Sequence, residues 1–337
     1  MFAKPSGARS PAPALHLLSC ENMVRYYAKV EGRLRELEKP EPRTWVNISP
    51  PFSQEELEEV SQRFDIPMDF LTDSLDVDER SRYELEEDVK LILINTPVLN
   101  ETDEESDAIY VTVPIGIILA DEYLITITST ENPVLERFLE DKVKNFRPGD
   151  FRQFILQILE HNVYRFLTCL KKLDLKRNLI EQELYHASRN RELKQLLSIE
   201  KSLVYFVNSL SANDLLKMKM KRVDFLRIRD DEDRTDLFED IIIDNGQALE
   251  MANVYSNILS GTMDTYASII SNNMNVTIHR LTLITIFLAV PTLIASFYGM
   301  NVALPFDNSP YAVYVILGFS IFLSFLLGWY FQRKRLF

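Results

Sequence analysis

Glycine and histidine are scarce in this sequence, which has nine glycines and four histidines among 337 residues. The histidines stand far apart, without the HExxH spacing of a zinc hydrolase, and no GxSxG nucleophile motif occurs. A GxxxxGK(S/T) phosphate loop is also missing. These absences argue against an enzyme, against an ATP-driven pump and against an organic cofactor.

Basic charge is in short supply as well. The chain has 37 Lys and Arg residues against 50 Asp and Glu residues, a formal net charge of -13. A nucleic-acid partner is therefore not expected, because binding to phosphates requires basic surface. Cations are the natural partners of such a chain.

Cysteine is almost absent too. The two cysteines, Cys20 and Cys169, have no CxxC spacing, so neither a disulfide nor a metal site is assigned to them. Cys169 falls in a helical pattern, where we expect it to be buried as a small apolar side chain.

Residues 1–22 are rich in Ala, Pro and Ser, and their apolar stretch is too short and too broken for the core of a secretion signal. We expect a disordered leader, with a lipoprotein cleavage site before Cys20 as the minor alternative. Because the patterned sequence begins at Met23, the leader should be dispensable, and either Met1 or Met23 can be the true start.

Residues 23–149 alternate short apolar runs with helical patterns, which predicts a cytosolic α/β domain. Helices are expected from Ser53 through Phe64 and from Asn132 through Phe146, since each begins at a capping residue. The expected strands are Trp45 to Ile48, Leu91 to Val98, Ile109 to Leu119 and Tyr123 to Thr128.

The next segment is poor in helix breakers. From Asp150 to Tyr298 only Gly246, Gly261 and Pro291 interrupt the chain, which favours long helices. Breaks near residues 186–190 and 229–233 predict a helical hairpin over 150–233. A long stalk and pore helix should follow over 234–300.

Two uncharged stretches near the C-terminus are long enough to cross a bilayer, at 281–300 and 311–331. Residues 301–310 between them form a tight outer loop, and residues 332–337 form a basic tail. Basic residues flank the two spans on the same side, so both termini should lie in the cytoplasm. We therefore expect a multi-pass protein of the cytoplasmic membrane.

Two spans per chain cannot enclose a hydrophilic path, so a pore would require several copies. Small and polar residues recur every three or four positions along the first span and predict its inward face, although close helix packing explains the same pattern. The residues on this face are Asn275, Ile278, Thr282, Thr285, Ala289, Thr292, Ser296 and Gly299.

The end of the first span has the properties of an ion filter. Gly299 is a natural helix terminator, so the negative end of the helix dipole would point at an ion on the axis. Asn301 adds an amide oxygen without a full charge, which suits the water shell of Mg²⁺.

Tyr298-Gly299-Met300-Asn301 resembles the signature of the CorA-type magnesium channel family, together with the run Asn275 to Thr282, Pro291-Thr292 and Trp45 to Ile48. The resemblance implies a homopentameric funnel, with an α/β domain, a long helical stalk and a two-helix membrane hairpin. It assigns Gly299, Met300 and Asn301 to the filter, Thr292 to a pore ring, Ile278 and Leu281 to a hydrophobic constriction, and Asn275 to a polar ring.

The same resemblance implies that Mg²⁺ is both cargo and regulator, with inhibitory ions held at Asp73, Asp240 and Asp264. Two departures stand out. Ala289 replaces a methionine common in relatives, and the loop Leu304 to Asn308 lacks their acidic Pro-Glu pattern. The expected function is passive Mg²⁺ uptake gated by intracellular Mg²⁺. A Zn²⁺ or Co²⁺/Ni²⁺ transporter of the same superfamily is the alternative, and a scaffold without a working pore is a third possibility.

Overall fold

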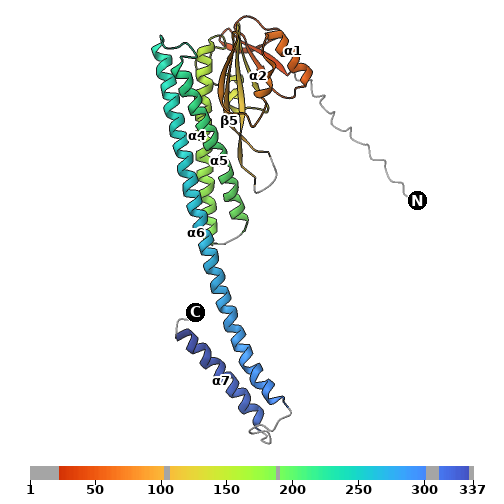
Figure 1. Ribbon diagram of the computed structural model, residues 1–337, viewed down its shortest axis with the longest axis vertical. Coiled ribbons are helices and arrows are strands. Elements are labelled where there is room, and N and C mark those ends of the chain that lie inside the picture. The colour runs from red at the N-terminus through yellow and green to blue at the C-terminus, as the bar shows by residue number, and fades with distance from the viewer. Residues whose placement is uncertain (1–22, 102–106, 187–189, 301–310, 334–337) are drawn as a thin grey trace, which may run out of the picture. The chain divides into compact units, whose positions relative to one another are not determined.

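The computed structural model describes residues 23–101, 107–186, 190–300 and 311–333 (Figure 1). The chain divides into two compact units, Met1–Asn257 and Ile258–Phe337. The first unit holds a sheet and a helical hairpin, and the second holds two apolar helical segments. The leader 1–22 and the loop 301–310 lie outside the described residues, so the expectations for them remain untested.

A seven-stranded mixed sheet forms the centre of the first unit, in the order β2-β1-β3-β7-β6-β5-β4. Only β3 and β7 pair in parallel among the described strands, and every other neighbouring pair is antiparallel. The strands are β1 (Val24–Val30), β2 (Arg33–Leu37), β3 (Trp45–Ile48), β4 (Arg82–Glu86), β5 (Val89–Leu99), β6 (Tyr110–Ala120) and β7 (Tyr123–Thr128).

Three short helices and three long ones belong to this unit in whole or in part. The short ones are α1 (Gln54–Phe64), α2 (Met68–Asp73) and α3 (Pro133–Leu139), and the long ones are α4 (Phe151–His186), α5 (Asn190–Arg222) and α6 (Glu232–Tyr298). Helix α6 continues into the second unit, where α7 (Ala312–Arg333) follows it.

The sheet separates two apolar cores, because successive side chains of a strand point to opposite faces. Trp45 packs with α3 and α4, whereas Val46 and Ile48 pack with α1 and α2. Between them, Thr126 accepts a hydrogen bond from the Trp45 indole at 2.8 Å and donates one to Asn47 at 2.8 Å. Both faces of β3 are therefore buried, which accounts for its short, largely apolar sequence.

The four expected strands are confirmed to within two residues at each end, as is the helix capped by Ser53. The helix expected from Asn132 through Phe146 is wrong in its extent, because α3 ends at Leu139. Asp141 and Asn145 adopt positive φ values of 53° and 56°, which a helix does not tolerate. This break lets the chain turn back and bury Phe146 against Trp45.

Strands β1, β2 and β4 and helix α2 were not expected. Strand β2 reads Arg-Leu-Arg-Glu-Leu and is largely exposed at the edge of the sheet, so its apolar signal is weak. Strand β4 forms the other edge and has no fully buried residue. An edge strand is stabilised by pairing with one neighbouring strand, and the sequence of the edge strand alone does not show which strand that is.

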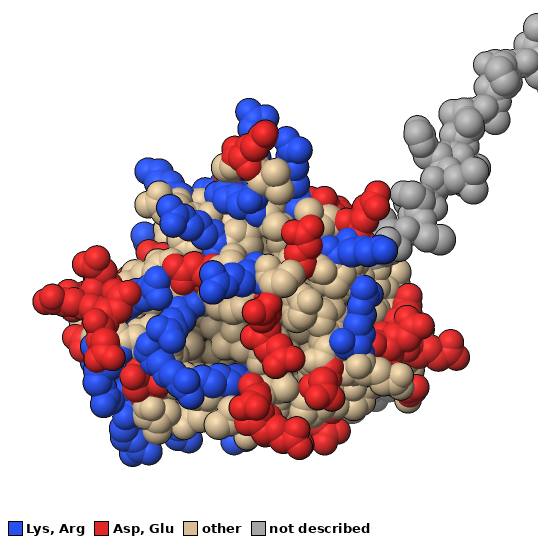
Figure 2. Space-filling view, turned by 90° about the horizontal axis from the view of Figure 1, so that it is seen from above, with Lys and Arg blue, Asp and Glu red and all other residues tan. Residues whose placement is uncertain are grey.

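Helices α4 and α5 form the predicted hairpin, and Cys169 on α4 is buried as expected. The second break spans residues 223–231, six residues earlier than expected at its start. Ion pairs then join α6 to the hairpin. Arg234 pairs with Asp150, the residue before α4, at 2.8 Å, and Glu239 pairs with Lys221 on α5 at 2.5 Å. On the face seen in Figure 2, acidic and basic side chains lie close to one another in the same way.

Candidate functional site

Helix α7 packs against one face of α6 within the second unit. The ring of Phe287 meets the ring of Phe325 edge-on at 5.4 Å and lies directly over Gly328. Further along, Pro291 and Ala295 face residues of α7 across an apolar groove. The half-buried residues of α6 in this region mark the covered face, and they are Leu283, Ile286, Phe287, Val290, Pro291 and Ile294.

The residues expected to line a pore lie on the opposite face of α6. At about 100° of rotation per residue, their mean direction is roughly 180° from that of the covered face. All of them are exposed in the single chain: Asn275, Ile278, Leu281, Thr282, Thr285, Ala289, Thr292, Ser296 and Gly299. A helix in a bilayer thus presents one face to α7 and keeps its small and polar face free of its own chain.

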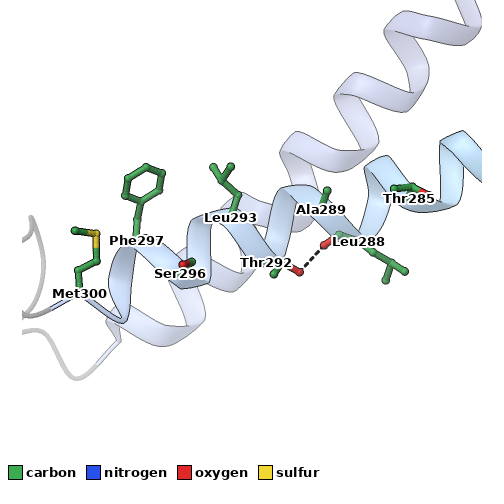
Figure 3. Close-up of a pocket in the computed structure, with 8 residues that line it drawn as sticks. All are labelled: Thr285, Leu288, Ala289, Thr292, Leu293, Ser296, Phe297 and Met300. Carbon is green, nitrogen blue, oxygen red and sulfur yellow. Dashed lines mark hydrogen bonds between the residues drawn. The ribbon is translucent and has the colours of Figure 1, made fainter.

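An open groove of about 660 Å³ runs along this exposed face (Figure 3). Four of the residues expected to line a pore line this groove, namely Thr285, Ala289, Thr292 and Ser296, and Met300 lines its end near the C-terminus of α6. Leu288, Leu293 and Phe297 also line it and were missed. Each of these three is adjacent in sequence to a residue of the predicted polar face. This adjacency is the sequence feature that could have indicated them.

The threonine hydroxyls on this face donate to carbonyl oxygens of their own helix. Thr282 bonds to Ile278 at 2.9 Å, Thr285 bonds to Leu281 at 2.9 Å, and Thr292 bonds to Leu288 at 2.7 Å. Because each hydroxyl proton is used within the helix, the oxygen lone pairs remain as acceptors. Such a surface accepts hydrogen bonds from the water shell of a hydrated cation.

Apolar side chains lie on the same face nearer the start of the predicted span. Ile278 is 51% exposed and Leu281 is 63% exposed, without cover from α7. Copies of these side chains brought together around an axis would form an apolar ring, which closes a water path by dewetting. Asn275 lies one turn before Ile278 and is also exposed.

Helix α6 ends where the filter was predicted. Its last residue is Tyr298, after which the amide of Gly299 donates to Ala295 at 3.0 Å and that of Met300 donates to Phe297 at 3.2 Å. A Cβ on Gly299 would meet its neighbours at 3.5 Å, an ordinary contact. The single chain thus gives no steric reason for glycine here. Asn301 lies outside the described residues.

The three predicted regulatory carboxylates do not form a metal site within one chain. Among the described residues no group of three or more His, Cys, Asp and Glu could hold a metal ion. Asp73 pairs with Arg82 at 2.6 Å, and Arg82 also contacts Glu79 and Glu84. Asp240 and Asp264 are exposed on α6, in the first and second unit respectively.

Within the part of the chain that the structure describes, two helices have the length and composition of membrane spans, α6 through its C-terminal part and α7 through Val313–Phe331. The most apolar window of α6 is not buried at all, and that of α7 is 11% buried. In a water-soluble protein such helices would normally be covered by other parts of the fold.

Known proteins are similar to this chain over most of its length. Residues 43–334 match the model of the family described as CorA-like Mg²⁺ transporter protein. The cobalt/magnesium transport protein CorA of Methanocaldococcus jannaschii is 28% identical over 312 residues, covering 90% of this chain and 95% of that protein. The CorA protein of Thermotoga maritima with the same description is 22% identical over 300 residues, covering 87% and 83%.

The fold is similar to a solved structure over nearly its whole length. The complete structure of the CorA magnesium transporter from M. jannaschii has a TM-score of 0.75 at 24% identity, covering 94% of this chain and 99% of that one. A soluble domain, a long helix and a C-terminal helix are thus shared between the two chains.

Proposed function

Because this chain belongs to the family of CorA-like Mg²⁺ transporter proteins, and is thus a divalent-cation transporter rather than an enzyme, we propose that it forms a passive channel with Mg²⁺ as its main cargo. The two opposite faces of α6 support this proposal most directly. One face is occupied by α7, and the other offers hydroxyl oxygens along a groove.

The channel is a homopentamer in which five copies of α6 surround the axis and α7 lies behind each one. The exposed groove of a single chain becomes one fifth of the wall of the pore. Gly299, Met300 and Asn301 form the filter, and Ile278 and Leu281 form the constriction. Both termini lie in the cytoplasm, because Arg280 and Arg333 flank the spans on the same side.

The membrane potential drives the ion. It contributes about 2.3 kcal/mol per charge per 100 mV, or roughly twice that for a divalent ion. Inhibitory Mg²⁺ binds between neighbouring subunits at Asp73, Asp240 and Asp264, where a divalent ion bridges carboxylates that otherwise repel one another.

Cobalt is the main competitor for the role of cargo, because both curated relatives are named cobalt/magnesium transport proteins. Zn²⁺ and Ni²⁺ remain alternatives within the same superfamily. Purified protein in liposomes, loaded with an ion-sensitive dye, can be supplied with each of the four ions in turn. Uptake of Mg²⁺ at lower concentrations than the other three supports the proposal, and a preference for Co²⁺, Zn²⁺ or Ni²⁺ would replace Mg²⁺ as the cargo.

Asn301→Ala should abolish Mg²⁺ flux while the protein still assembles, because the variant lacks the amide oxygen that holds the water shell of the ion. Asn308→Ala is the matched control, since it removes the same side chain from the same loop. Liposome flux and size-exclusion chromatography of both variants provide the test. Wild-type flux in correctly assembled Asn301→Ala would rule out this filter.

A further inference from the structure

A lysine in the helical part of the first unit has no access to solvent. Lys217 on α5 has 0% exposure, and its Nζ donates a hydrogen bond to Oδ1 of Asn245 at 2.6 Å. Asn245 lies on α6 and is itself completely buried. Two polar side chains thus meet inside the interface between the hairpin and the helix that continues into the second unit.

The amide of Asn245 is held from both ends. Its Oδ1 accepts from Lys217, while its Nδ2 donates to the carbonyl oxygen of Leu210 at 3.0 Å and to Oδ1 of Asp214 at 3.3 Å. All three partners lie on α5, within two helical turns. One side chain of α6 is therefore fixed in register against a short segment of α5.

The neighbouring residues of α6 allow this close approach. Ile241, Ala248 and Ala252 share the buried face with Asn245, and two of them are alanines. A larger side chain at either alanine position would move the helices apart and lengthen the bonds to Asn245. The hydrogen bonds of Asn245 therefore depend on the close packing of α6 on α5.

Lys217 has no ion pair within 4 Å among the residues that the structure describes, although it is fully buried. Burial lowers the pKa of Lys217 to about 7, while the carboxylate of Asp214 acts in the opposite direction. Among the described residues, Asp214 is the one charged group that acts appreciably on the amine, and the side chain facing it from α6 is the neutral amide of Asn245.

We propose that Lys217 is a positioning residue for α6, whose neutral amine holds the helix on the hairpin and whose protonation releases it. The consequence for transport rests on the proposed function, in which α6 lines the pore. The pH of the solution around the first unit then becomes an input to the channel, through a contact outside the membrane-spanning segments.

The direction of the pH effect follows from the number of protons that Lys217 binds in the packed and in the released state. In the released state Lys217 faces water and has the ordinary pKa of about 10.4, so between pH 7 and pH 10 release binds one proton. The ratio of released to packed molecules therefore rises up to about tenfold for each unit by which the pH falls in this window. Below about pH 6 both states are protonated, and the ratio no longer changes.

Amine acylation of the full-length protein, followed by digestion and mass spectrometry, tests the state of the amine. Lys219 is the internal control, because it is exposed on the same helix. Acylation consumes the neutral amine, so the labelling rate of a lysine in water rises about tenfold per pH unit while the pH is well below its pKa. Lys217 should be labelled at a rate independent of pH between 8 and 10. A fall in pH raises the fraction of released molecules, but it lowers by the same factor the share of them whose amine is neutral and can react. A tenfold rise per unit at Lys217 would overturn the proposal.

Mg²⁺ flux into liposomes at pH 7, 8 and 9 tests the coupling to the pore. Lys217→Met, which is neutral at every pH and similar in size, should lose the pH dependence of the wild type, whereas Lys219→Met should keep it. Because Lys217→Met leaves Oδ1 of Asn245 without its donor, Lys217→Met with Asn245→Leu serves as a second variant if the first does not fold.

Identical pH profiles in the wild type and in both Lys217 variants would refute the coupling, as would a wild-type flux that does not change with pH. If the wild type conducts no ion at all, the proposed transport function fails, and the coupling fails with it. The acylation experiment does not depend on transport, so it still decides whether Lys217 is a neutral contact that protonation releases.

Discussion

At the scale of single residues, Gly116 and Gly299 differ in whether the fold of the single chain requires a glycine. Gly116 on β6 faces Ser74 so closely that a Cβ would lie 2.0 Å from its Oγ and 2.7 Å from Ile127. Ser74 is itself buried and donates to the carbonyl oxygen of Phe70 at 2.6 Å. Gly116 is therefore needed for α2 to pack on the sheet, whereas a methyl group fits at Gly299.

Gly299→Ala should leave the thermal unfolding temperature unchanged but reduce Mg²⁺ flux, because the added methyl group makes only ordinary contacts in its own chain and would crowd the assembled filter. Gly116→Ala should instead lower the thermal unfolding temperature without reducing Mg²⁺ flux, because overpacking destabilises the protein by about 1–3 kcal/mol. Calorimetry and liposome flux of both variants make the comparison. Normal flux in Gly299→Ala would mean that the filter does not bring its copies close together.

At the scale of elements, helix α6 has different partners along its length. Its N-terminal part buries Phe238, Ile241 and Ala248 in the first unit, and its C-terminal part packs one face against α7. One 67-residue helix thus belongs to both units. A change at the Lys217 contact would therefore act on the same helix that carries the predicted pore face.

Gly328→Leu should destabilise the packing of α7 on α6, since a Cβ at this position already lies 3.1 Å from the ring of Phe287. Gly318→Leu is the matched control on the same helix, because a Cβ there has nothing within 4 Å. Thermal unfolding of the detergent-solubilised protein should shift downward for Gly328→Leu alone. A larger shift for Gly318→Leu would indicate that this surface of α7 is covered in the assembly.

At the scale of the whole molecule, the predicted regulation depends on contacts that one chain cannot make. Asp73 is already paired with Arg82 within the chain, and the described residues offer no three-ligand site. An inhibitory Mg²⁺ would therefore have to compete with Arg82 for Asp73 and obtain its other ligands from a neighbouring subunit. We expect binding of modest affinity, in the range where intracellular Mg²⁺ can regulate it.

Asp73→Asn combined with Asp240→Asn should keep the channel conducting at millimolar internal Mg²⁺, because a ligand can shift an equilibrium only by its differential affinity for the two states. Asp76→Asn combined with Asp236→Asn is the control, since it removes the same charge from exposed neighbours. Flux at low and at millimolar internal Mg²⁺ would be compared for both pairs and the wild type. Equal inhibition in all three proteins would place the gate elsewhere.

The sequence by itself determined the features that depend on local pattern. Uncharged stretches of sufficient length predicted the two membrane spans, and a three-four spacing of small and polar residues predicted the free face of α6. Gly299, the expected helix terminator, directly follows the last residue of α6, and Ser53 caps α1 as expected. Such features need only the periodicity of the helix and the solvent that each side chain prefers.

Only the tertiary structure decided the features that depend on partners distant in sequence. It ended α3 at Leu139, paired the edge strands β2 and β4, and joined Asp73 to Arg82. It also placed Lys217 against Asn245, a contact for which the sequence offers no warning, since a lysine in a helix is usually exposed. The physical reason is that burial and pairing depend on what the rest of the chain brings to a residue, and no local pattern contains that information.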